Sequence, residues 1–182
     1  MGEKLSMLIS ADRSTLVVID SQKRLMPAIH NHELVVSQCI RLANIATLLH
    51  IPIIGTEQNS QSLGQNLDSI RSFCSTTISK VHFNACEDGL IHQIDNLRNQ
   101  VILIGCEAHI CVLQTAFGLL NKNLEVFVVE DCIGSRESRQ IASACNRMHS
   151  AGISIATLEM VAFEWLRSSK TSRFKDILNI IK

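Results

Sequence analysis

Short runs of consecutive apolar residues alternate with helix-patterned segments along most of this 182-residue chain. Strands that are apolar on both faces and separated by helices are typical of a parallel sheet covered on both sides. The pattern therefore predicts a three-layer α/β/α fold with a doubly wound, mostly parallel six-stranded sheet, and we expect for it the order 3-2-1-4-5-6 that is common among such folds. The expected strands are 15–19, 52–55, a short strand ending at 79–80, 101–104, 125–129 and 153–156.

Helical periodicity fills the stretches between these strands. Apolar residues step by three or four along each helical segment, and Gly152 follows one of them as a natural stop. No repeat, linker or low-complexity tract divides the sequence, so we expect residues 1–182 to form a single domain. The expected helices are 34–49, a segment near 89–97, one that begins near residue 111, 137–151, and one or two after 156, with a partly helical loop at 59–72.

Charge and hydropathy argue against two classes of partner, although RNA in a small local groove stays open. Lysine plus arginine and aspartate plus glutamate number 17 each, and no basic stripe stands out, which argues against a nucleic-acid surface. No stretch reaches the ~20 apolar residues that a membrane-spanning helix needs. The start does match the myristoylation pattern, with Gly2 and Ser6 in M-G-x-x-x-S, but one acyl chain anchors weakly, and we expect an unmodified terminus.

Cysteine usage indicates a reducing compartment. The chain has seven cysteines, an odd number with no C-x-x-C pair, and its first residues lack the hydrophobic run of a signal peptide. We therefore expect free thiols and a cytoplasmic protein, with a mitochondrial location left open.

Cys111 lies where a buried strand gives way to a helix. A thiol at a helix start feels the positive end of the helix dipole, which favours the nucleophilic thiolate. The alternative is a buried, inert cysteine. We accept that alternative for the other six, and Cys111 is the position in the chain where we first look for a nucleophile.

Several polar residues follow the ends of different expected strands. Because the carboxyl ends of parallel strands meet at one edge of a sheet, we expect Asp20, Glu57, Lys80 and Cys111 to gather there. Neither G-x-G-x-x-G nor G-x-x-x-x-G-K-[ST] occurs, so a dinucleotide or P-loop site is not predicted.

An aspartate after the first strand, a lysine after the third and a cysteine opening a helix resemble the isochorismatase-like cysteine hydrolases. Within them, the chain is most similar to the isochorismatase domain-containing proteins, a branch that includes the bacterial YcaC-type hydrolases. The likeness lies in LVVIDSQ at 16–22, TEQNSQSLG at 56–64, ISKVHF at 78–83, ILIGCEAHICVLQTA at 102–116 and NRMHSAG at 146–152.

The resemblance implies a catalytic triad of Asp20, Lys80 and Cys111. In these roles Cys111 attacks an electrophilic carbon to give a thioester-type intermediate, Asp20 is the general base, and Lys80 holds both in place. It also implies a cis peptide at Cys106–Glu107, which aims the backbone N–H groups of Glu107 and Cys111 at an oxyanion.

Four further residues are candidates to bind a substrate. Glu57 and Gln58 would read a polar group, or equally end their strand in solvent, and Phe83 and Ile110 would form apolar walls. The nicotinamidases of the family carry an aspartate and histidines that bind a metal, and this chain has no comparable cluster. The spacing of its histidines and cysteines also fits no regular zinc pattern, so no metal and no cofactor are expected.

These residues together predict a metal-independent cysteine hydrolase that acts on a small amide, ester or related molecule. The alternatives are a binding protein that retains the fold without turnover, a nuclease-type role, and a thiol redox protein, which would lack a resolving cysteine at C-x-x-C spacing. The resemblance also implies a homo-oligomer, with the apolar C-terminal segment around Trp165 and Leu166 as a candidate subunit contact.

Overall fold

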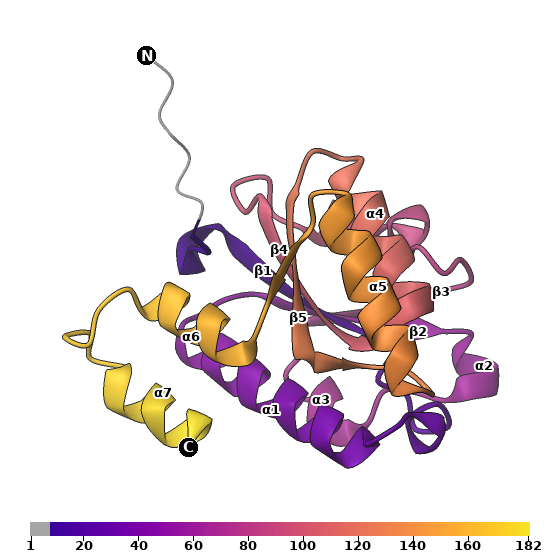
Figure 1. Cartoon of the computed structure of the whole chain (residues 1–182), viewed down its shortest axis with the longest axis horizontal. Helices are drawn as coiled ribbons and strands as arrows, with labels where there is room; N and C mark the ends of the chain where they lie inside the picture. Colours follow the sequence, from indigo (N-terminus) through magenta and orange to yellow (C-terminus); the bar gives the residue numbers. More distant parts are fainter. Residues whose placement is uncertain (1–7) are drawn as a thin grey trace.

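The computed structural model describes residues 8–182, and within this range six strands form one parallel sheet (Figure 1). Its order is β3-β2-β1-β4-β5-β6, which confirms the expected doubly wound topology. Gly2 and Ser6, the residues of the myristoylation pattern, lie outside the described range. The strands are β1 (Ser14–Ile19), β2 (Ile53–Gln58), β3 (Thr76–Lys80), β4 (Gln100–Cys106), β5 (Glu125–Gly134) and β6 (Ser154–Ala156).

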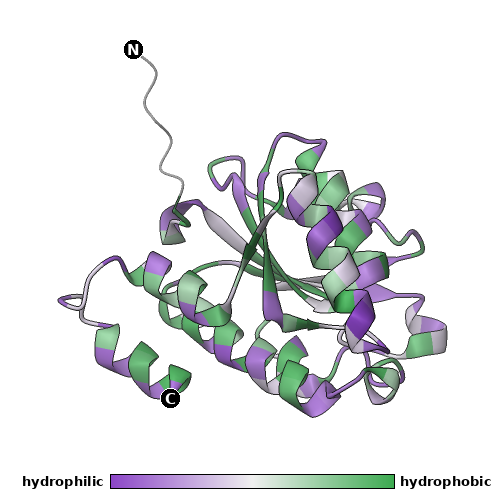
Figure 2. Ribbon diagram, in the orientation of Figure 1, coloured by the Kyte–Doolittle hydropathy of each residue, from purple (hydrophilic) through white to green (hydrophobic). Residues whose placement is uncertain are grey.

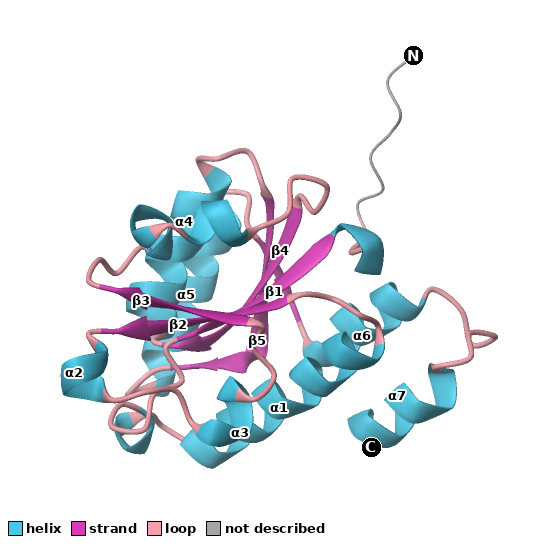
Figure 3. Cartoon of the chain, turned by 180° about the vertical axis from the view of Figure 1, so that it is seen from behind, coloured by secondary structure: helices cyan, strands magenta, loops and turns pink. Residues whose placement is uncertain are grey.

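Helices cover both faces of the sheet and enclose two apolar clusters. One cluster joins the sheet to α1, α6 and α7, and the other joins it to α4 and α5. Figure 2 shows the apolar strands at the centre and the more polar outer surfaces of the helices, and Figure 3 shows the same layers from behind. The helices are α1 (His32–Leu48), α2 (Ser60–Leu63), α3 (Asp68–Arg71), α4 (Leu113–Leu120), α5 (Ser138–Ser150), α6 (Leu158–Leu166) and α7 (Phe174–Ile181). Within residues 8–182, no helix combines the length and the hydropathy that a membrane crossing requires.

The helix expected near 89–97 is wrong. Two short 3-10 helices occupy this region instead, Ala85–Asp88 and Leu90–Gln93. Gly89 separates them with φ +96°, a left-handed conformation that breaks helical hydrogen bonding and that glycine adopts readily. Leu97, expected inside the helix, is 82% exposed.

Strand β5 extends beyond its expected end at residue 129, as far as Gly134. Its register against β4 shifts between Leu103 and Gly105, so the chain bulges and then resumes pairing. Within the bulge, the Asp131 carboxylate accepts a hydrogen bond from the Leu158 backbone N–H at 2.9 Å. An aspartate that looked like a strand end in the sequence therefore anchors the start of α6.

The C-terminal residues expected at a subunit contact are buried in their own protomer. Trp165 and Leu166 are each 4% exposed and belong to the apolar cluster under α1. The Trp165 indole donates a hydrogen bond to the Ser14 hydroxyl at 2.9 Å. That expectation is corrected, because α6 turns this face inward to close the core.

Gly105 lets the two central strands approach closely. Its φ is +107°, and a Cβ atom at this position would overlap the Ile19 carbonyl oxygen on β1. Only glycine satisfies both conditions. The strand ends that carry Asp20 and Cys106 are therefore held side by side.

Candidate active site

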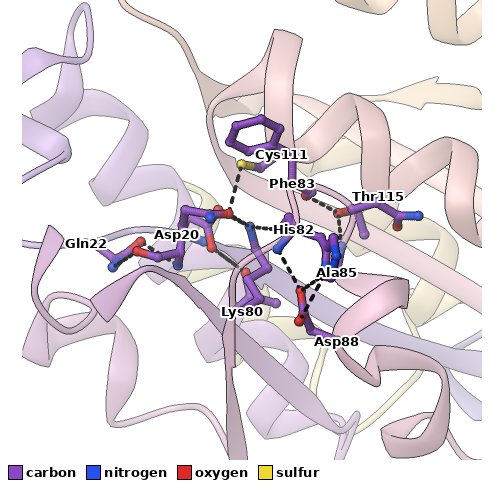
Figure 4. Close-up of polar contacts among 12 residues, drawn as sticks. Asp20, Gln22, Lys80, His82, Phe83, Ala85, Asp88, Cys111 and Thr115 are labelled. Atoms are coloured by element: carbon purple, nitrogen blue, oxygen red, sulfur yellow. Dashed lines mark hydrogen bonds and ion pairs between the residues drawn. The ribbon is translucent and has the colours of Figure 1, made fainter. Parts of the chain in front are cut away.

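The polar residues expected at one edge of the sheet do lie there, around the point where the strand order reverses. Asp20 directly follows β1, Gln58 ends β2 and Lys80 ends β3, while Cys111 lies in the segment that follows β4. β1 and β4 are neighbours whose connections run in opposite directions, which is where doubly wound folds place ligands. Figure 4 shows how the Asp20, Lys80 and Cys111 side chains lie.

Asp20 and Lys80 form a buried ion pair. Lys80 Nζ lies 2.8 Å from Asp20 Oδ2, and both side chains are fully buried. Asp20 has a φ of +45°, a left-handed conformation that turns the chain at the end of β1 and that aspartate tolerates better than most residues. Thr56 fixes the carboxylate by donating its hydroxyl proton to Oδ1 at 2.6 Å. Charges buried this deeply persist only when they are paired and hydrogen-bonded.

The Lys80 ammonium contacts three acceptors in the described part of the chain. Besides Asp20, it donates to Gln58 Oε1 at 2.6 Å and to the His82 carbonyl at 3.3 Å. Asp88 supports the last contact, because its Oδ2 accepts the backbone N–H groups of Val81 and His82. The three N–H donors of the ammonium are thus matched by three acceptors, from the ends of β1 and β2 and from the loop after β3.

The Gln22 side chain continues the hydrogen bonding between the β1 and β2 segments after their backbone-to-backbone bonds end. This buried side chain accepts from the Gln58 N–H at 2.9 Å and donates to the Gln58 carbonyl at 3.0 Å. It also donates to the Gly64 carbonyl at 2.6 Å. The Gln22 side-chain amide therefore makes the two hydrogen bonds that the backbone of a neighbouring strand would make, and it fixes the position of Gln58.

Cys111 lies in a π-helical turn, Ala108–Val112, that leads into α4. Its side chain is only 6% exposed, and its Sγ lies 4.0 Å from Gln58 Oε1. Burial raises the pKa of the Cys111 thiol to about 12; the Asp20 carboxylate raises it further, and the Lys80 ammonium opposes this. Burial therefore outweighs the helix dipole and favours the protonated thiol at neutral pH.

The segment between β4 and Cys111 is tied to the β5–α5 connection. The Cys106–Glu107 peptide is cis, as the resemblance implied. The Glu107 carboxylate accepts from Arg136 Nε at 2.8 Å, and His109 Nδ1 lies 3.0 Å from the Ser135 hydroxyl. These contacts hold in place the backbone on which Glu107 and Cys111 carry the N–H groups expected at an oxyanion.

The structure separates Glu57 from the triad and leaves Gln58 within it. Neighbouring strand residues point to opposite faces, and the Glu57 carboxylate accepts from the Asn66 N–H at 2.9 Å. Phe83 is half exposed in the loop after Lys80, and Ile110 is half-buried against the cluster under α4. Within residues 8–182, no three His, Cys, Asp or Glu side chains are grouped as a metal site.

Sequence reasoning did not assign roles to Thr56, Gln22 and Asp88. Thr56 orients Asp20, Gln22 fixes Gln58, and Asp88 presents the His82 carbonyl to Lys80. A faint signal existed for Gln22, an uncharged polar residue directly after the buried run that ends in Asp20. Nothing in the sequence singled out Asp88.

The sheet order, with an aspartate, a lysine and a cysteine at its switch point, defines an isochorismatase-type α/β protein. Residues 14–160 match the Isochorismatase domain, and the chain belongs to this family. Isochorismatase domain-containing protein 2A of Mus musculus is 33% identical over 96% of this chain and 85% of its own length.

Solved structures agree with this assignment. The MAR1 ribonuclease of Caenorhabditis elegans superposes with a TM-score of 0.90 and 31% identity over 96% of this chain and 92% of its own. The Escherichia coli YcaC gene product, described as an octameric hydrolase of unknown specificity, gives a TM-score of 0.87 over 96% of this chain and 95% of its own. At 19% identity, that second likeness shows the fold alone.

Proposed function

We propose that this protein is a metal-independent cysteine hydrolase that acts on a small amide, ester or related molecule through Asp20, Lys80 and Cys111. The observation that carries the proposal is a buried ion pair beside a thiol: the charges of both Asp20 and Lys80 act on Cys111. Buried charge is costly, and its concentration around one of seven cysteines favours a chemical role.

The proposed reaction begins with a neutral thiol. Asp20 takes the Cys111 proton as the sulfur attacks the acyl carbon, so proton transfer and attack are coupled. Asp20 then returns the proton to the leaving atom, the carbon–heteroatom bond breaks, and a thioester remains. Asp20 next takes a proton from water, which attacks the thioester and releases the acid and the thiol.

Lys80 stabilises whichever partner carries the negative charge. Before attack the charge is on Asp20, and during proton transfer it passes to the sulfur and then to the substrate oxygen. The ammonium interacts with both Asp20 and Cys111, so it compensates the charge at each stage. The N–H groups of Glu107 and Cys111 are the proposed donors to the oxyanion.

A hydrolysis screen with a matched cysteine variant tests the proposal. Amides and esters are supplied to the wild type, to Cys111→Ala and to Cys86→Ala, whose thiol is also partly buried and has a pKa raised to about 11. We expect turnover by the wild type and Cys86→Ala and none by Cys111→Ala, with acyl adducts on Cys111 visible by intact-protein mass spectrometry. Turnover that persists in Cys111→Ala rejects the mechanism.

A nuclease role has one specific support, the name of the nematode structure. The equal number of basic and acidic residues argues against a dedicated nucleic-acid surface. RNA cleavage by the wild type that Cys111→Ala retains would favour this role over the hydrolase, and binding without any turnover would favour a binding protein.

We also propose a homo-oligomer in a reducing compartment, the cytoplasm first. The octameric description of the E. coli YcaC gene product supports assembly, and two exposed apolar side chains on α6, Met160 and Phe163, offer a contact face. None of the seven cysteines is paired, as a reducing compartment requires. Light scattering of the purified chain tests the assembly.

A further inference from the structure

We propose that Gln58 determines substrate class by presenting a fixed hydrogen-bond acceptor beside the Cys111 thiol. It would select molecules that carry an N–H on the leaving atom, namely primary or N-monosubstituted amides, over the matching esters. This inference rests on the proposed hydrolase function and specifies its substrate.

The orientation of the Gln58 amide is set by its partners. Its Nε2 donates to the Val81 carbonyl at 2.8 Å, and its Oε1 accepts from Lys80 Nζ at 2.6 Å. A flipped amide would turn its NH₂ group toward an ammonium and its oxygen toward a carbonyl, so both contacts would become repulsive. The side chain therefore presents oxygen, and not nitrogen, to the site.

The backbone of Gln58 is fixed as well. The buried Gln22 amide pairs with both its N–H and its carbonyl. Val81, which receives the side-chain amide, is itself held through its N–H by Asp88 Oδ2 at 3.2 Å. An acceptor whose backbone and side-chain amide are both fixed keeps its direction when a substrate arrives, which is the condition for a specificity contact.

The position of this oxygen matches the leaving atom of an acyl substrate. Oε1 has two lone pairs: Lys80 Nζ donates to one, and the Cys111 thiol, with its Sγ at 4.0 Å, is directed at the other until its proton leaves during the attack. An acyl carbon in position for attack stands about 3–3.5 Å from the sulfur. A nitrogen bonded to that carbon can then donate its N–H to Oε1, whereas an ester oxygen would place lone pair against lone pair.

The contact is compatible with the balance of the reaction. The C–S bond forms as the C–N bond breaks, and Asp20 passes the thiol proton to the departing nitrogen. Gln58 transfers nothing and accepts the N–H that the nitrogen already carries. A site built to pair a substrate N–H discriminates against an analogue that lacks it.

Matched amide and ester pairs test the inference in the full-length protein. Benzamide with methyl benzoate, and butanamide with methyl butanoate, are assayed with the wild type, Gln58→Met, Gln58→Glu and Cys111→Ala. We expect Gln58→Met to lower the amide-to-ester ratio of kcat/KM at least about tenfold, because the acceptor is lost. Gln58→Glu keeps an acceptor toward both Lys80 and the substrate but places its second oxygen against the Val81 carbonyl, so overall turnover should fall while the amide-to-ester ratio stays nearer that of the wild type than in Gln58→Met.

The outcomes separate this inference from the proposed function. Equal loss of amide and ester turnover in Gln58→Met overturns the inference, since it assigns Gln58 only to the support of Lys80, while the hydrolase function stands. Absence of Cys111-dependent turnover of every pair overturns both.

Discussion

Cys106 and Cys111 are close in the sequence but lie in opposite apolar clusters of the same domain. Cys106 is fully buried among groups that include Cys39, and burial raises its pKa well above the ordinary value of 9.0. Cys111 is also buried and has a raised pKa, but it faces the Asp20–Lys80 pair. Low acidity therefore does not separate an inert thiol from a candidate nucleophile. The cation does, because Asp20 acts on both thiols whereas Lys80 acts on Cys111.

The largest effect is expected when the Lys80 ammonium, the cation beside Cys111, is removed. Lys80→Met leaves the Asp20 carboxylate buried without its counter-charge, and we expect it to lower the free energy of unfolding by about 3–5 kcal/mol in urea titrations. Lys23→Met is the control, because the Lys23–Asp68 pair is exposed and is worth less than about 1 kcal/mol. Similar losses in the two variants would contradict a special role for the buried pair.

Cys106 ends β4, and Cys111 lies in the segment that follows this strand. The conformation of Gly105, directly before Cys106, therefore affects the position of both thiols. Gly105→Ala combines an unfavourable φ with a clash against Ile19, whereas Gly152→Ala has a φ of +93° and no atom within 4 Å of the added carbon. We expect Gly105→Ala to be less stable than Gly152→Ala by about 1–3 kcal/mol in thermal or urea unfolding. Equal stability would mean that the close approach of β4 to β1 is not required.

The stability of the protein at alkaline pH tests the inert, buried thiols of this comparison, of which Cys39 is one. Burial raises the pKa of Cys39 to about 12 in the folded protein, so between pH 9 and 12 the unfolded chain holds fewer protons there. Stability is then complete below pH 9 and falls as pH rises, by about 1.4 kcal/mol per pH unit for each such thiol. The chain has no tyrosine to obscure this titration.

Cys39→Ala should therefore flatten the alkaline loss of stability. Val18→Ala, a buried deletion in the same apolar cluster that removes no titrating group, should lower stability equally at every pH in this range. If the free energy of unfolding falls with pH as steeply in Cys39→Ala as in the wild type, the raised pKa of Cys39 is not its cause.

The smallest predicted effect concerns the reactivity of Cys111 itself. Asp20 raises the pKa of the thiol, so Asp20→Asn should lower that pKa and speed alkylation by iodoacetamide at pH 7.5, by about tenfold for each pKa unit. The same variant should lose turnover, because the general base is gone. Mass-spectrometric labelling rates, with Cys86 as the internal reference, test this opposite pair of effects. Slower labelling of Cys111 would contradict it.

The fold was predictable because parallel strands buried on both faces leave continuous apolar runs, as 101–104 and 125–129 do. The region after Lys80 was not, since its short 3-10 helices depend on Gly89 and on local side-chain contacts such as that of Asn84 with the Cys86 N–H. Element boundaries in β5 were missed because a bulge is a property of two strands together.

The sequence allowed prediction of those site residues that end or follow a strand. Asp20, Lys80 and Cys111 could be placed at one edge from topology alone. The role of Gln22 could not, because its partner Gln58 belongs to another strand and the pairing exists only in the folded sheet. The raised pKa of Cys111 could not be predicted, because helix position is visible in a sequence and the extent of burial is not.

Lys80 also has a mechanical consequence for the sheet. It ends β3, the edge strand of the sheet, and is the one residue of that strand that is fully buried. Its ammonium bridges the ends of β1 and β2 and the loop after β3. The Lys80 ammonium, which we propose balances charge in the reaction, therefore also attaches the edge strand β3 to the rest of the sheet. When β3 separates from the sheet, the ammonium leaves Asp20 and Gln58, and the site comes apart with it.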